Sequence, residues 1–352
     1  MLNEKNIFFS ILSLILLLSL VFFFELRLSS DSKTYLNSSD QITSLRSIFT
    51  IQQPLYFMSY LIFKLINLFE NFNFLFKIFN FTCFILIVIY SNKILTFHNV
   101  HLSNKYEILF FYLLFFLNFD MVQWTYYALT DLVLVASLLA SIYYFLKKNI
   151  LLVVLISSFA LLIKPQSIFI FFILGYIIFL QKNYKHLTFF YLYFLFYLSL
   201  FIVTYIINIL DIRVHLFDIC YKIFFSKIIN GIVIDDRIFI DYVNIFSIFK
   251  IYILRSFYLF SVFFKEYSMK HIIYNLFYFA CLYLPLLVYF LKKIPFNKKF
   301  VNFILGCLFI VAIFLILSFI DYDLRYRIYL YPFLIMLSTY CFKKLYARKK
   351  FE

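Results

Sequence analysis

The sequence predicts an all-α fold, a polytopic transmembrane helix bundle of about ten spans that forms one domain over residues 1–352. Of the 352 residues, 65% are hydrophobic and only three are glycine, and the mean hydropathy of +0.95 is too high for a water-soluble globule. Apolar runs of roughly 20 residues, the length at which a helix crosses about 30 Å of hydrocarbon, recur along the whole chain. These observations indicate an integral membrane protein.

The apolar runs give the expected spans in chain order. The first run has no small-residue cleavage site after its apolar core, so we expect it to remain as an anchor. No repeat, glycine-rich linker or soluble domain interrupts the later runs. We expect spans near 6–28, 74–93, 107–124, 126–146, 149–163, 166–182, 187–209, 270–291, 300–320 and 328–346.

Two segments between spans, 29–73 and 210–269, are too long to be turns, and functional residues are expected there. Within the first, 54–70 is apolar but carries both a lysine and a glutamate. Counting it as a span would invert every later loop, so we expect a helix that lies along the outer leaflet. The stretch 245–265 has the same character. Interfacial helices on the extracytoplasmic side would thus cover the outer end of the bundle.

Basic residues fall on one side of the ten-span arrangement, as they do in cytoplasmic loops. That side has only the acids Glu4, Glu107 and Glu352, whereas most aspartates fall on the other side. We therefore expect a multi-pass protein of the bacterial inner (plasma) membrane with both termini in the cytoplasm. Half of the basic residues behind the net charge of +15 belong to this asymmetry, and no basic stripe remains for a nucleic acid.

The residues best placed for chemistry lie near the expected outer surface. Asp31 follows the first span directly, where a carboxylate stays ionised and still faces a substrate whose tail lies in hydrocarbon. Lys164 lies between two apolar runs, where an ammonium needs an anionic partner, and the Arg325 and Arg327 guanidinium groups can each bind two phosphate oxygens. The alternatives are a solvated aspartate for Asp31, a snorkelling side chain for Lys164, and pairing with nearby aspartates for the two arginines.

Other acids and histidines have weaker signals for a role in chemistry. Asp131, near the outer end of its span, has two candidate roles, orienting an acceptor or holding Lys164, and Asp120 is a weaker version of the same idea. Asp235, Asp236 and Asp241 lack histidine at ligand spacing and are expected to form a solvated loop. No cofactor is expected and no metal site is indicated. His98 and His101 have no assigned role, and the cysteine placement implies no disulfide framework.

Short motifs in fixed order give the chain a resemblance to a known family. Asp31-Ser-Lys-Thr-Tyr35-Leu and then Pro54-Leu-Tyr56 follow the first span, Ala128-Leu-Thr-Asp131 opens the fourth, Lys164-Pro165 follows the fifth, and Arg325-Tyr-Arg327 precedes Tyr331-Pro332. This pattern resembles the GT-C superfamily of glycosyltransferases, which includes protein O-mannosyltransferases and the aminoarabinose transferase that modifies lipid A. The chain departs from many members in having one acid rather than two adjacent acids at 31–32, Phe57 in place of a second proline, and no carboxy-terminal soluble domain.

The resemblance implies an inverting enzyme that moves a sugar from a polyprenyl-phosphate donor to an extracytoplasmic glycan, lipid or protein. Asp31 would be the general base, Lys164, Arg325 and Arg327 would bind the donor phosphate, and Asp131, Tyr35, Tyr56 and Asp120 would orient the acceptor. The sugar and the acceptor stay open.

Two other functions stay open as well. An O-antigen polymerase or ligase would rely on late-loop arginines such as Arg213, Arg237 and Arg255. A transporter or lipid flippase would instead need polar groups at mid-bilayer depth and broken helices in paired halves.

Overall fold

The computed structural model describes residues 4–43, 56–181, 252–253, 256–257, 259, 268–318 and 324–349. Within these ranges the regular structure is helical, and one isolated backbone bridge joins Arg27 to Tyr127. The elements are α1 Glu4–Phe22, α2 Ser30–Asp40, α3 Phe57–Asn67, α4 Phe72–Phe97, α5 Lys105–Phe116, α6 Phe119–Gln123, η3 Trp124–Tyr126, α7 Asp131–Leu146, α8 Ile150–Ile163, η4 Pro165–Ile168, α9 Phe169–Gln181, α13 Met269–Leu291, α14 Lys298–Ser318, η6 Leu324–Tyr329 and α15 Tyr331–Lys349.

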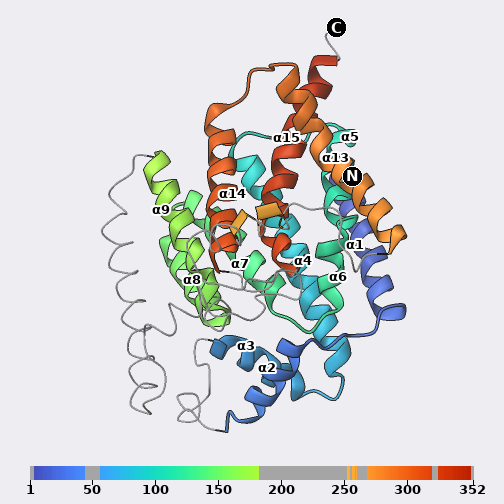
Figure 1. Ribbon diagram of the computed structural model, residues 1–352, viewed down its shortest axis with the longest axis vertical. Helices are drawn as coiled ribbons and strands as arrows, with labels where there is room; N and C mark the ends of the chain where they lie inside the picture. The colour runs from blue at the N-terminus through green and yellow to red at the C-terminus, as the bar shows by residue number, and fades with distance from the viewer. Residues whose placement is uncertain are drawn as a thin grey trace.

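The long helices form a bundle with α2 and α3 together at one end and the chain's C-terminus at the other (Figure 1). Three described helices, α4, α13 and α14, are long and apolar enough to cross a membrane. The helix α5 and the helical turns after it, which meet at a bend of 53°, form a fourth such segment if they are counted together as one broken span. The predicted all-helical fold is confirmed, and these apolar helices indicate a membrane protein. The predicted number of about ten spans is not confirmed, because several other apolar helices are short.

The first expected interfacial helix corresponds to α3, which has 11 residues and is too short to span a bilayer by itself. It packs against α2 and against α8. Its Lys64 donates a hydrogen bond to the carbonyl of Ile42, just beyond α2. The expected span at 187–209 lies outside the described residues, as does most of the expected helix at 245–265.

In two of the expected spans the helix is interrupted or starts later than predicted, and hydrogen bonds of single residues explain both differences. The run 107–124 is divided between α5 and α6 because Asn118 leaves the helix and its Oδ1 accepts the Met121 N–H at 2.8 Å, capping α6. In the run 126–146 the α-helix starts only at Asp131, because the backbone before it pairs with Arg27. The Arg27 backbone N–H donates to the Tyr126 carbonyl at 2.8 Å, and the Arg27 carbonyl accepts the Ala128 N–H at 2.9 Å. Both breaks place an aspartate at or near the start of a helix.

The end of α1 is fixed by a buried lysine of α4. Lys77 donates to the carbonyls of Leu20 at 2.8 Å and Phe24 at 3.0 Å, which satisfies acceptors that the end of α1 leaves open. The chain then runs through Arg27, whose backbone pairs with the segment before α7. Sequence-distant segments are thus held together, and α2 begins beside the start of α7.

Four of the five cysteines lie in the described part of the chain. Cys83, Cys281, Cys307 and Cys341 are free thiols there, and Cys220 lies outside the described residues.

Candidate functional site

A buried ion pair lies where α7 begins and α8 ends. The Lys164 Nζ is 2.7 Å from the Asp131 Oδ1, and the two residues are 4% and 0% exposed. Asp131 opens α7, where the helix dipole favours a negative charge, and Lys164 follows the last residue of α8, where the dipole favours a positive one. Because each charge would be costly to bury alone, the pair is a strong local constraint. This is the contact with Lys164 that the sequence suggested for Asp131.

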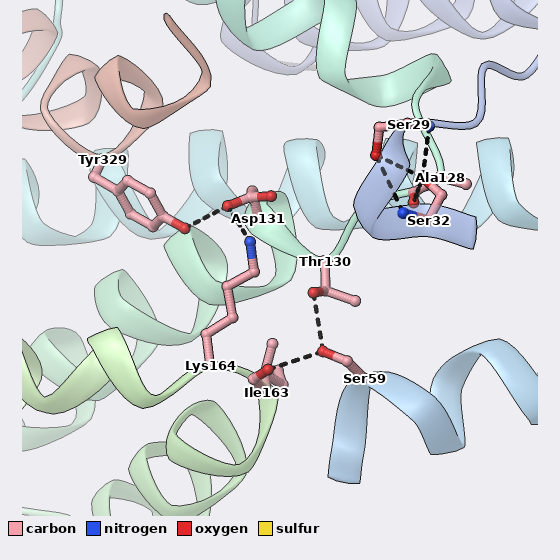
Figure 2. A network of polar contacts seen from close by, with 9 residues as sticks. All are labelled: Ser29, Ser32, Ser59, Ala128, Thr130, Asp131, Ile163, Lys164 and Tyr329. Atoms are coloured by element: carbon pink, nitrogen blue, oxygen red, sulfur yellow. Dashed lines mark hydrogen bonds and ion pairs between the residues drawn. The ribbon is translucent and has the colours of Figure 1, made fainter. Parts of the chain in front are cut away.

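Tyr329 joins the ion pair from the other end of the sequence. Its hydroxyl donates to the same Asp131 Oδ1 at 2.7 Å, and its side chain is buried. Figure 2 shows the tyrosine and the lysine approaching the carboxylate from different sides. Hydrogen bonds to an ionised acceptor are stronger than neutral ones, so η6 is held to the start of α7.

A second buried acid lies close by in the fold. Asp120 of α6 accepts a hydrogen bond from the hydroxyl of Tyr331, which is two residues after Tyr329. Two residues before Tyr329 on the same segment, Arg327 is 2% exposed, and its guanidinium carbon lies 5.9 Å from the centre of the Phe279 ring. Two acids and two cations of the predicted set, Asp131, Asp120, Lys164 and Arg327, are therefore buried around the segment that leads into α15.

Asp31 lies in the first turn of α2 and is partly exposed. Ser29 and Ser32 form a reciprocal cap at this helix start, and the Ser32 hydroxyl also donates to the carbonyl of Ala128 at 2.6 Å (Figure 2). Ala128 is three residues before Asp131. The chain that carries Asp31 is thus attached to the chain that carries the ion pair, although the two are 100 residues apart in sequence.

Ser59 of α3 contacts the residue that precedes each member of the ion pair. Its hydroxyl lies 3.0 Å from the Thr130 hydroxyl and donates to the Ile163 carbonyl at 2.9 Å. Thr130 immediately precedes Asp131, and Ile163 immediately precedes Lys164. Since all of these residues are buried, α3 holds the ends of α7 and α8 in one relative position.

Tyr35 and Tyr56 belong to an aromatic cluster between α2 and α3. Their ring centres are 6.0 Å apart, and Tyr35 also contacts Tyr60 at 5.8 Å and Phe63 at 5.4 Å. Tyr35 is buried and Tyr56 is partly exposed. The cluster is joined to the ion pair through Ser59, which lies in α3 next to Tyr60.

Several predicted residues cannot be placed as side chains. The backbone of Arg325 lies in η6, and its side chain is outside the described part, as are Asp321 and Asp323. Arg213, Arg237, Arg255 and the aspartates at 235, 236 and 241 also lie outside the described residues. Among the residues that are described, no group of three or more His, Cys, Asp or Glu side chains could hold a metal ion.

The sequence interpretation missed the uncharged members of the site. Tyr329 and Tyr331 lie close in sequence to Arg325 and Arg327, and this proximity is the one sequence feature that associates them with the charged residues. Ser59 and Ser32 carry no such signal, because serine is common both at helix starts and inside apolar helices.

No protein-family model, curated protein or solved structure matches the chain.

Proposed function

We propose that the protein is an integral-membrane, inverting glycosyltransferase that moves one sugar from a polyprenyl-phosphate donor to an extracytoplasmic acceptor. The observation that supports it best is the buried Lys164–Asp131 pair, attached through Ala128 to the helix start that carries the partly exposed Asp31. A cation for the phosphate and a carboxylate for the proton are the two groups this transfer needs. The motif resemblance to GT-C enzymes points to the same reaction.

In the proposed reaction an acceptor hydroxyl oxygen attacks the anomeric carbon as the bond from that carbon to the phosphate oxygen breaks. The hydroxyl proton passes to the carboxylate of Asp31, and the polyprenyl phosphate leaves with the bonding electron pair as an anion. Lys164, Arg325 and Arg327 stabilise the charge that develops on the leaving phosphate. Asp131 holds the ammonium of Lys164 in place before the donor arrives, and the Tyr329 hydroxyl in turn holds the Asp131 carboxylate.

The proposal includes an arrangement in the membrane. About ten spans would bring both termini to the cytoplasmic side of a bacterial inner membrane, with short apolar helices such as α7, α8 and α9 among the spans. The 29–73 segment, with α2 and α3, would then lie on the outer side together with Asp31. Donor, acceptor and general base would meet at the outer surface.

A direct test uses purified protein and a panel of polyprenyl-phosphate hexoses and pentoses, with release of free polyprenyl phosphate as the readout. We expect wild-type protein to turn over one donor and Asp31→Asn to lose about 100-fold or more of the rate, because an amide cannot accept the proton. Asp40→Asn is the matched control, since Asp40 is an exposed residue at the far end of the same helix. Full turnover by Asp31→Asn would remove the general-base role.

One observation favours a second function, transport of a lipid or an ion. Four buried charged side chains gather at the ends of short or bent helices, and helix breaks of this kind also line transport pathways. Reconstituted vesicles separate the two functions: a transporter moves its substrate across the bilayer without breaking a glycosidic bond, whereas the proposed enzyme releases polyprenyl phosphate.

A further inference from the structure

The turn between α13 and α14 concentrates positive charge. It connects two of the three described helices that are long and apolar enough to cross a membrane, so it lies where two such helices end. Four lysines flank it, all exposed: Lys292, Lys293, Lys298 and Lys299. The sequence has no acidic residue from Met269 to Ser318 that could neutralise them.

A fifth lysine comes from α15. The Asn297 backbone N–H donates to the Tyr340 hydroxyl at 2.7 Å, which ties the turn to α15. The exposed Lys344 is one helical turn further along, with its Nζ 5.9 Å from the centre of the Tyr340 ring. The α13–α14 turn and the neighbouring part of α15 thus form a lysine cluster, which we define as these five residues.

The backbone that carries the cluster is anchored. The Tyr289 hydroxyl donates to the Pro295 carbonyl at 3.0 Å, and the Asn297 Oδ1 accepts the Phe300 N–H at 3.3 Å. Lys298 and Lys299 occupy the first turn of α14, where the helix dipole disfavours cations and favours an anion. Without an anion, these like charges repel one another on a fixed frame, so an anionic ligand would relieve both unfavourable terms.

An apolar stripe runs along α13 toward the lysines. Its members are exposed and recur at spacings that place them on one face of a helix: Ile273, Phe277, Leu284, Leu287 and Leu291. Leu291 is 72% exposed and directly precedes Lys292. A hydrocarbon-facing surface followed at once by fixed cations matches a lipid, whose acyl chains continue into an anionic head group.

We propose that the lysine cluster and the apolar stripe of α13 form a binding site for an anionic phospholipid, with the phosphate on the lysines and the acyl chains along α13. The occupant is a lipid of the surrounding leaflet with a net negative head group. Basic clusters next to spans attract such lipids, and charge complementarity distinguishes them from zwitterionic ones. This site is separate from the proposed transfer of a sugar and does not depend on it.

The test measures lipid retention by purified protein in mixed micelles of detergent with phosphatidylglycerol or phosphatidylcholine, using native mass spectrometry and the thermal midpoint. We expect wild-type protein to retain phosphatidylglycerol about tenfold more than phosphatidylcholine, and to lose the preference at high salt. Lys292→Gln/Lys298→Gln should lose most of the preference, whereas Lys292→Arg/Lys298→Arg should keep it.

The matched control is Lys147→Gln/Lys148→Gln, which removes the same charge from the exposed turn between α7 and α8. It should keep the wild-type preference. Equal retention of both lipids by wild type would overturn the proposal, and so would an equal loss in the control, because the attraction would then belong to total charge. If the Gln variant aggregates, the proposal is tested with the Arg variant and the salt titration. A preference for phosphatidylglycerol that does not change with salt would also contradict the site.

Discussion

Asp131 is fully buried and accepts hydrogen bonds from both Lys164 and Tyr329, so its charge depends on partners that are 33 and 198 residues away. The ammonium balances the carboxylate, and the tyrosine adds a charge-assisted bond. Removing one partner leaves the other charge buried without full compensation. The stability of this buried cluster therefore depends on both partners of Asp131.

A double-mutant cycle measures this coupling. We expect Lys164→Met to lower the free energy of unfolding by about 3–5 kcal/mol, because it leaves the Asp131 carboxylate without its cation. The double variant Lys164→Met/Asp131→Leu should cost clearly less than the sum of the two single variants. Denaturation in detergent provides the values, and strict additivity would mean that the two residues do not stabilise each other.

His98, the residue that follows the last turn of α4, makes the stability of the protein depend on pH. Burial lowers the pKa of His98 from 6.5 to about 4. The centre of its ring lies 4.6 Å from that of Phe303 and 5.6 Å from that of Phe300. Between pH 6.5 and pH 4 the unfolded chain binds a proton that the folded protein does not, so the free energy of unfolding falls as the pH falls. The full contribution is present above pH 6.5.

We expect this effect to be on the order of 1–2 kcal/mol, with the steepest loss between pH 6.5 and pH 4. The comparison is the thermal midpoint of wild type and of His98→Phe across that range. The variant keeps an aromatic ring and cannot titrate, so its midpoint should change less. Identical pH profiles would show that His98 is not responsible.

At the scale of elements, the packing of α9 on α14 depends on the absence of a side chain. A Cβ at Gly306 would overlap the ring of Tyr176, whose hydroxyl donates to the Asn302 carbonyl at 2.8 Å. Tyr176 therefore lies across α14 at the glycine, and any larger residue must displace the ring. Gly306 therefore leaves the space that the Tyr176 ring occupies against α14.

Gly306→Ala should destabilise the protein by about 1–3 kcal/mol, because the ring must move and its hydrogen bond is strained. In a Tyr176→Ala background the same exchange should cost nothing or stabilise by up to about 1 kcal/mol, since the obstructing ring is gone and alanine favours a helix interior more than glycine does. Thermal midpoints of the four proteins in detergent test this. A full cost of Gly306→Ala in the Tyr176→Ala background would show that another contact is responsible.

Hydropathy predicts apolar elements such as α4 and α13 well, because the length and burial of an apolar run depend on local composition. It misses α2, which is a polar helix set by the Ser29 and Ser32 cap, and it joins α5 to α6 across Asn118. Charge singled out Asp131 and Lys164, and the structure pairs these two side chains. Their attachment to Ser59 and Tyr329 depends on tertiary contacts between distant segments.

At the scale of the whole molecule, α2 and α3 lie together at one end of the bundle and the C-terminus of α15 lies at the other (Figure 1). The exposed lysines in the turn between α7 and α8 and in the turn between α13 and α14 follow the ends of helices that run toward the C-terminal end. This separation fits an orientation with the lysine-rich end in the cytoplasm and Asp31 outside.

Cysteine labelling in intact cells tests the orientation. We expect single cysteines at Lys33 and Glu70 to react with an impermeant reagent from outside, because both residues are exposed and flank the short α3 region. A cysteine at Lys148 should react only after the membrane is opened. Labelling of the Glu70 position only from the cytoplasm would show that α3 crosses the membrane and that every later loop is inverted.

The role of the buried lysine in binding a polyprenyl phosphate is tested by the binding of undecaprenyl phosphate, compared with undecaprenol, to purified wild type and to Lys164→Met. The lipids differ only in the phosphate, so we expect wild type to bind the phosphate about 10- to 100-fold more tightly and the variant to lose most of this difference. Asp40→Asn should behave as wild type, which controls for surface charge on the outer side. Equal binding of the two lipids by wild type, or an unchanged phosphate preference in Lys164→Met, would contradict a polyprenyl-phosphate site at the buried lysine.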